Sequence, residues 1–170
     1  SIQDPTYFKT AFNTVQSLIL EDQIAAGHDI GSGGLITSLL ELCFADVNLA
    51  ADYDLSALQE ADTVKAFFNE NIGLVLQAQN DATFESKMSA AGIQAVKIGT
   101  VKEGNTISVK NQNDQFNFDV AETRDTWFKT SYLLDQKQSK NGTAQARFEN
   151  YKHQPLQYHF PTQFDGKKPV

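Results

Sequence analysis

Cysteine, basic charge and long apolar runs are all scarce in this sequence, and each scarcity excludes a class of protein. Cys43 is the only cysteine, so no disulfide can form within the chain, and a reducing cytoplasm suits it. Lysine and arginine number 14 against 21 aspartates and glutamates, giving a formal net charge of −7. This balance argues against binding to nucleic acid or to an anionic membrane surface. No stretch approaches the ~18 apolar residues that a membrane span needs.

The N-terminus also lacks a secretory signal, since it reads only Ser-Ile-Gln-Asp-Pro. The chain does not begin with Met, so we expect it to be a piece of a longer protein. Its 170 residues suffice for one domain with its own core rather than two. A content of 41% hydrophobic and 21% charged residues is typical of a globular protein, which we expect to be cytoplasmic.

A glycine-rich stretch at residues 25–35 carries the strongest chemical signal. Glycines allow a sharp turn and close approach to a ligand, and a helix beginning at Gly33 or Gly34 would direct its free N–H groups into the loop. Such a loop can bind a phosphate group, and the Asp29 carboxylate suits Mg²⁺ bound to that phosphate. The predicted nucleotide-binding residues are Gly31, Ser32, Gly33 and Gly34, with Asp29 as the metal ligand.

Each of these residues also has a purely structural interpretation. The glycine loop could be a tight turn that packs a helix on a sheet, and Asp29 could form an Asx turn or a helix N-cap. His28 is either a general base or a hydrogen-bonded structural residue. Glu70 either reaches a ligand or is a solvated loop carboxylate, and Glu41 should face a partner or an edge. We assign no catalytic residue.

The remaining pattern predicts an α+β fold of mixed α/β layers rather than a Rossmann repeat. We expect helices over residues 5–21, 34–45, 62–68, 81–91 and 120–138, and strands over 47–53, 72–78, 95–101, 106–110 and 116–119. Residues 24–26 are read as a short apolar lead-in to the loop. One domain should span residues 1–138, followed by a linker and an irregular, aromatic-rich tail over 139–170, with His153 and His159 in tail packing and Cys43 in the core.

Three motifs occur in an order that resembles the aminoimidazole ribonucleotide synthetase superfamily. Residues 28–35 (His-Asp-Ile-Gly-Ser-Gly-Gly-Leu) are similar to its His-Asp-(Ile/Val)-Ser-x-Gly-Gly-Leu signature. Residues 68–73 are similar to its Phe-x-Glu-x-x-Gly marker, and residues 99–101 to its Ile-Gly-x-Val strand. The resemblance covers residues 5–120 and implies the C-terminal domain of the two-domain unit of that superfamily, with helices packed on a mixed sheet.

Residues 124–132, 147–151 and 160–167 resemble, more narrowly, the family of large, single-chain phosphoribosylformylglycinamidine synthases. These enzymes use ATP and glutamine to convert formylglycinamide ribonucleotide to formylglycinamidine ribonucleotide in purine biosynthesis. The resemblance implies the second C-terminal-type domain, just before the glutaminase, and an auxiliary site for Mg²⁺ and ATP or ADP. It implies that Asp29 binds the metal there, while Gly31 stands where the family usually has a nucleotide-binding serine.

The leading hypothesis is therefore a domain of an ATP-dependent amidotransferase ligase that is inactive alone. Its implied partners are the nucleotide and the other synthetase domains and glutaminase domain of the same polypeptide, without nucleic acid or membrane. Two alternatives stay open: a non-catalytic scaffold or interaction domain with the same fold, and a domain of another synthetase of the superfamily.

Overall fold

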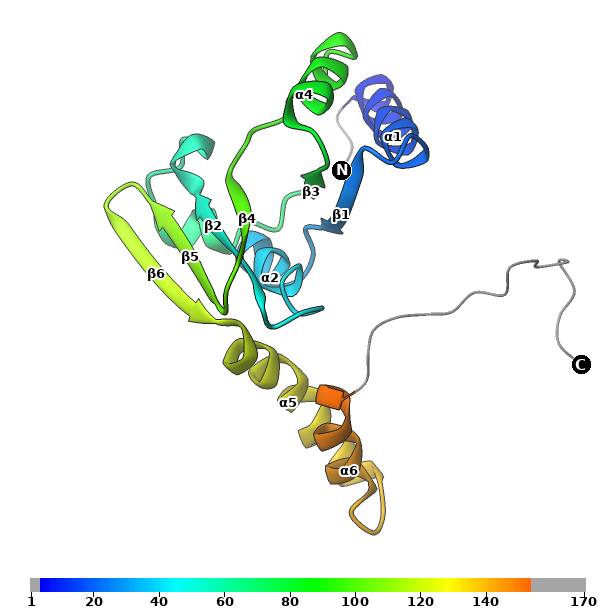
Figure 1. Ribbon diagram of the computed structural model, residues 1–170, viewed down its shortest axis with the longest axis vertical. Coiled ribbons are helices and arrows are strands. Elements are labelled where there is room, and N and C mark those ends of the chain that lie inside the picture. Colours follow the sequence, from blue (N-terminus) through cyan, green and yellow to red (C-terminus); the bar gives the residue numbers. More distant parts are fainter. Residues whose placement is uncertain (1–3, 154–170) are drawn as a thin grey trace, which may run out of the picture. The chain divides into compact units, whose positions relative to one another are not determined.

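A computed structural model describes residues 4–153 of this protein, and these residues divide into two units, with the boundary between Asp125 and Thr126 (Figure 1). The first unit begins with helix α1, Pro5–Leu20. The Asp4 side chain accepts hydrogen bonds from the N–H groups of Thr6 and Tyr7. Pro5 has no N–H group, but at the first helical position an N–H would have no partner within the helix, so proline costs nothing there. The helix therefore starts where the sequence predicts.

Two separate sheets follow. Strand β1 (Ile24–Asp29) pairs antiparallel with β3 (Leu74–Ala78). The second sheet has the order β4-β2-β5-β6, in which β2 (Leu49–Asp54) and β5 (Thr106–Asn111) are parallel and the outer pairs are antiparallel. Its other strands are β4 (Gly99–Glu103) and β6 (Asp114–Asp119). The helices of this unit are α2 (Gly34–Glu41), α3 (Thr63–Phe67), α4 (Asp81–Ala90) and the short 3₁₀ turn η1 (Leu55–Leu58).

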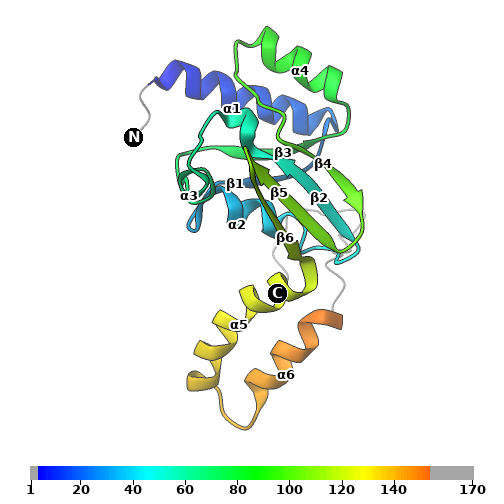
Figure 2. The same cartoon turned by 90° about the vertical axis from the view of Figure 1, so that its left-hand side faces the viewer.

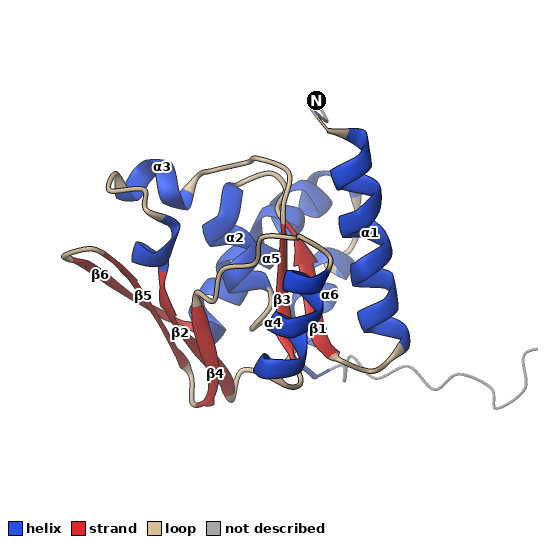
Figure 3. Cartoon of the chain, turned by 90° about the horizontal axis from the view of Figure 1, so that it is seen from above, coloured by secondary structure: helices blue, strands red, loops and turns tan. Residues whose placement is uncertain are grey.

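The main core lies between α2 and one face of the four-stranded sheet (Figure 3). Along β5 the buried Ile107 and Val109 alternate with Ser108 and Lys110, as expected for a strand with one face in the core and one in water. Leu39 of α2 is fully buried in the same cluster. A second, smaller cluster of Leu18, Met88 and Ile93 joins α1 to α4.

The second unit is a helical hairpin. Helix α5 (Val120–Gln138) enters it from β6, and α6 (Thr143–Asn150) runs back beside α5 before the turn η2 (Tyr151–His153) (Figure 2). The hairpin is held by the ion pair between Arg147 and Asp135 and by two stacked ring pairs, Phe128 with Tyr151 and Tyr132 with Phe148. Residues 128, 132 and 135 recur at helical spacing, so one face of α5 makes all three contacts.

The predicted fold class is confirmed, and the bounds of α5 are those that the sequence predicts. Four local predictions were wrong. Residues 24–26 belong to strand β1, the helix predicted over 34–45 ends at Glu41, and the strand predicted over 95–101 begins only at Gly99. Residues 143–150 form a helix rather than an irregular tail. Helix α6 is stabilised by ring stacking on α5, and such a contact cannot be detected from the spacing of apolar residues within α6.

The predicted boundary after residue 138 stays a prediction. The part of the predicted tail over residues 154–170, His159 included, lies outside the described residues. Within residues 4–153, no helix combines the length and the apolar character that crossing a membrane requires.

Candidate functional site

The glycine loop joins the end of β1 to the start of α2, and two of its glycines are required by backbone geometry. Gly33 and Gly34 both have positive φ angles, of 91° and 75°, which side-chain-bearing residues rarely adopt. A Cβ on Gly34 would also lie 2.6 Å from the Cα of Phe68. The helix begins at Gly34, as the sequence predicts, and its first turn packs directly against the backbone of the segment that precedes β3.

The N–H groups at this junction already have acceptors within the chain. The N–H of Gly33 donates to Oε1 of Glu70 at 2.9 Å, and the N–H of Leu35 donates to the carbonyl of Asn69 at 3.1 Å. The N–H of Gly34 donates to the carbonyl of Gly31, also at 3.1 Å. A phosphate at this loop would have to displace Glu70 to reach the Gly33 N–H, or bind through other groups of the loop.

Gly31 differs from the other two loop glycines. Its φ angle is not positive, and among the described residues no atom beyond its chain neighbours lies within 4 Å of the place that a Cβ would take. A serine would therefore fit at this position without strain. The glycine at residue 31 is not demanded by the fold.

Asp29 presents its carboxylate to solvent at the last position of β1. The side chain is 82% exposed, while the backbone carbonyl is held by hydrogen bonds from the Ser38 hydroxyl at 3.0 Å and from His28 Nδ1 at 2.6 Å. Among residues 4–153, no group of three or more His, Cys, Asp or Glu side chains is placed to hold a metal ion. Asp29 thus offers one oxygen of the kind that Mg²⁺ prefers, and the described residues do not complete a metal site around it.

His28 links β1 to the end of α2. Its Nε2 lies 2.8 Å from Oε2 of Glu41, and its Nδ1 donates to the Asp29 carbonyl. Both ring nitrogens lie within hydrogen-bond distance of oxygen atoms of the chain, which is the arrangement expected of a hydrogen-bonded structural histidine. Glu41 faces this histidine.

The contact made by Glu70 is not among those predicted from the sequence. The sequence offered only two interpretations, a ligand-binding carboxylate and a solvated one, whereas the structure pairs it with Gly33. The joint occurrence of the motifs at 28–35 and 68–73 is the signal that could have found this contact, because the carbonyl of Gly73 also accepts from the N–H of Ile30 at 3.0 Å. The two motifs form one structural element.

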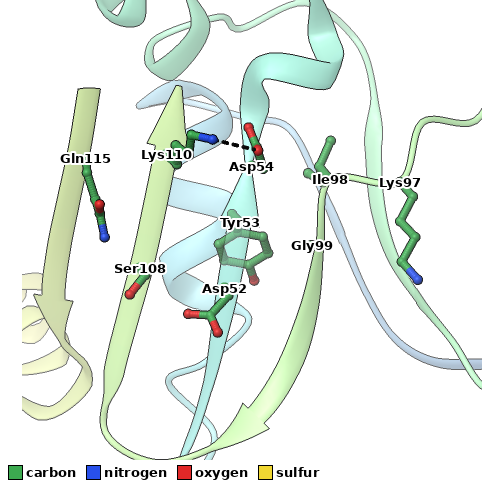
Figure 4. A pocket seen from close by; sticks show the side chains of 9 residues that line it. All are labelled: Asp52, Tyr53, Asp54, Lys97, Ile98, Gly99, Ser108, Lys110 and Gln115. Atoms are coloured by element: carbon green, nitrogen blue, oxygen red, sulfur yellow. Dashed lines mark hydrogen bonds and ion pairs between the residues drawn. The ribbon is translucent and has the colours of Figure 1, made fainter. Parts of the chain in front are cut away.

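A shallow cavity of about 400 Å³ lies on the outer face of the four-stranded sheet (Figure 4). Asp54 and Lys110, which line it, form an ion pair at 3.5 Å. Hydrogen bonds from Ser56, followed by the charge of Lys110, lower the pKa of Asp54. A polar, open face with paired charges is what the solvated face of a one-sided sheet presents to water, so we assign no ligand to it.

Cys43 belongs to the core, as predicted. Burial raises the pKa of its thiol, and Sγ lies 3.8 Å from the carbonyl of Leu39. Burial also raises the pKa of Tyr53, whose hydroxyl donates to the same carbonyl at 3.4 Å. A thiol with a raised pKa is a poor nucleophile, which argues against covalent catalysis at Cys43.

Comparison with known proteins gives matches over most of the chain. Residues 1–111 match the family model described as "AIR synthase related protein, C-terminal domain". An Arabidopsis thaliana protein named as a probable chloroplastic/mitochondrial phosphoribosylformylglycinamidine synthase is 32% identical over 160 residues, which is 91% of this chain but 11% of the relative. The chain therefore spans only about a ninth of that relative's length.

Solved structures of a bacterial protein share the fold. T. maritima PurL complexed with ATP matches with a TM-score of 0.59 at 22% identity, covering 71% of this chain and 22% of the other. The same protein complexed with FGAR matches with a TM-score of 0.58 at 20% identity, covering 72% and 22%. At these identities the structures establish the fold, and again this chain is a fraction of the matched length.

Proposed function

Because the chain belongs to the family of AIR synthase related C-terminal domains, we propose that it works as one domain of a phosphoribosylformylglycinamidine synthase. In that enzyme ATP and glutamine drive the conversion of an amide to an amidine in purine biosynthesis. This chain spans a small part of its plant relative, so the activity belongs to the whole polypeptide. The other synthetase domains and the glutaminase are its proposed partners, and the isolated chain is expected to be inactive.

The proposed role of this domain is to contribute to an auxiliary site for Mg²⁺ and ATP or ADP. The observation that carries it is the exposed Asp29 carboxylate at the mouth of a glycine loop that leads into a helix N-terminus. Asp29 would supply one metal ligand, and residues 31–34 would line the phosphates. The bound cation would neutralise phosphate charge, and its remaining ligands would come from a neighbouring domain.

In this role, the residues around Asp29 hold its backbone and orient its carboxylate. The Ser38 hydroxyl and His28 fix the carbonyl of Asp29, so the direction in which the carboxylate leaves β1 is set by α2 and by the neighbouring ring. Glu41 holds that ring at its other nitrogen. The amide chemistry itself would take place elsewhere in the polypeptide.

The test uses the full-length polypeptide that contains this chain. After incubation with Mg-ADP and gel filtration in Mg²⁺, Asp29→Asn should retain much less ADP than wild type, measured by nucleotide analysis. Asp52→Asn, on the outer face of the four-stranded sheet, is the matched control and should retain it. Equal retention in Asp29→Asn and wild type would overturn the metal assignment.

A second candidate function, a scaffold domain without nucleotide, is favoured by the internal pairing of the Gly33, Gly34 and Leu35 N–H groups. It predicts that no nucleotide is retained even with all companion domains present. Gly31→Ser separates the two functions, since the added hydroxyl fits sterically. It should increase ADP retention at a nucleotide site and change nothing in a scaffold.

The cytoplasmic location expected from the sequence is also part of this proposal. The plant relative is named as chloroplastic/mitochondrial, so the two proteins would differ in compartment. Fluorescence microscopy of the tagged full-length protein would test it, and an organellar signal would contradict it.

A further inference from the structure

In the loop before β3, two large apolar side chains are exposed to solvent, whereas a charged side chain is turned toward the backbone of the glycine loop. Phe68 and Ile72 are 60% and 75% exposed, while Glu70 between them directs its carboxylate to the N–H of Gly33. A charge-assisted hydrogen bond from a backbone N–H to a carboxylate is stronger than a neutral one. The placement of a negative charge at the N-terminus of α2 is favoured further by the helix dipole.

The segment from Asn69 to Gly73 holds the glycine loop at three points. The carbonyl of Gly73 accepts from Ile30, and the carbonyl of Asn69 accepts from Leu35. Between these two backbone contacts, the Glu70 side chain binds Gly33. The loop from residue 30 to residue 35 is thus fixed at both ends by backbone and near its centre by one side chain.

Gly33 is the position where this support matters most. Its φ of 91° and ψ of −2° reverse the chain just before α2 begins, and it makes no side-chain cap of its own. Without an acceptor for its N–H, a glycine in such a loop samples many backbone conformations. The direction of the loop relative to Asp29 would then no longer be fixed.

We propose that Glu70 is the positioning residue of the site: its carboxylate holds Gly33 and so shapes the loop that a nucleotide would meet beside Asp29. This inference rests on the proposed nucleotide site. Glu70 acts through Gly33 and touches neither metal nor nucleotide. It joins the two sequence motifs by a side-chain contact across 37 positions of the chain.

Three variants of the full-length polypeptide test the role. Glu70→Gln keeps an oxygen that can accept from Gly33, so ADP retention should stay within about twofold of wild type. Glu70→Ala removes the acceptor and should weaken Mg-ADP binding about 10-fold, as loss of an orienting partner does at metal sites. Glu70→Asp keeps the charge but is one methylene shorter, so it should behave like Glu70→Ala. Glu103→Ala, an exposed carboxylate at the end of β4, is the matched control and should bind as wild type.

Amide hydrogen exchange in the 170-residue chain gives a readout that needs no nucleotide. The Gly33 amide should exchange slowly in wild type and Glu70→Gln, and at least about 10-fold faster in Glu70→Ala and Glu70→Asp. Should the alanine variant fail to fold, the Gln and Asp pair still decides the question. Unchanged Gly33 exchange in Glu70→Asp, or ADP loss in Glu70→Gln equal to that in Glu70→Ala, would overturn the role.

The outcome at Asp29 separates this inference from the proposed function. If Asp29→Asn loses ADP while Glu70→Ala retains it, the site stands and the positioning role is wrong. If Asp29→Asn retains ADP, the metal assignment itself is wrong.

Discussion

Substituting alanine for Gly34 should destabilise the first unit strongly. The new Cβ would lie 2.6 Å from both the Cα and the carbonyl carbon of Phe68 and 2.7 Å from the carbonyl oxygen of Phe67. All three are backbone atoms, so no side chain can rotate away to make room. The φ of 75° adds strain of its own, because a Cβ is disfavoured in the left-handed region.

The size of the effect follows from these two causes. The left-handed conformation costs about 1–2 kcal/mol for a residue with a Cβ. Forcing an extra methyl into a packed site costs about 1–3 kcal/mol. Their sum gives a loss of about 2–5 kcal/mol in the free energy of unfolding for Gly34→Ala, a large fraction of the total stability of a small domain.

The measurement is urea unfolding of the 170-residue chain followed by far-UV circular dichroism. Gly31→Ala serves as the matched control, since its Cβ would meet no described atom within 4 Å, and it should stay within about 0.5 kcal/mol of wild type. The two variants add the same methyl group to the same loop. A loss below about 1 kcal/mol in Gly34→Ala, or equal losses in both variants, would refute the close approach of Phe68 to α2.

Three further predictions concern other parts of the chain. Hydrogen bonds from Arg147 and then from Ser139 lower the pKa of Asp135, so this contact stabilises the α5–α6 hairpin above the ordinary Asp pKa of about 3.9 and is lost as the pH falls through the lowered value. The difference in helicity between wild type and Asp135→Asn should therefore vanish in strong acid, and a difference that persists there would contradict the assignment. Asn111 is fully buried and donates to the Glu60 carbonyl at 3.0 Å, so Asn111→Ala should lower the free energy of unfolding by about 1–3 kcal/mol, seen as a lower urea midpoint. Cys43 should react slowly with iodoacetamide in the folded chain and rapidly in urea, as followed by mass spectrometry, and equal rates would show that its thiol is accessible.

Much of the fold could be predicted because its signals are local. Asp4 followed by Pro5 marks the start of α1, and Asn80 caps α4 through a hydrogen bond from the N–H of Thr83. Strand β5 is marked by Ile107 and Val109 alternating with polar residues, between two turns rich in Asn and Gly or Asp. Such features depend on neighbours a few positions away, which a single sequence displays.

The remaining features depend on contacts that are distant in sequence. Strand β1 exists because Ala26 to Asp29 pair with β3, almost fifty residues later, and nothing within residues 24–29 requires an extended chain. Helix α6 depends in the same way on stacking against α5. In the candidate site, the sequence indicated the glycines and Asp29, but it could not show that the N–H of Gly33 already has an acceptor in Glu70.

Each of the two units contains one natural residue whose signal can report on its unfolding. The sequence has one tryptophan and one cysteine. Trp127 belongs to the helical hairpin, where its ring makes a T-shaped contact with the ring of Phe128, whereas Cys43 is buried in the core of the first unit. Tryptophan emission thus follows the hairpin and thiol labelling follows the first unit, so the natural sequence, without engineered probe residues, can reveal whether the two unfold together or in succession.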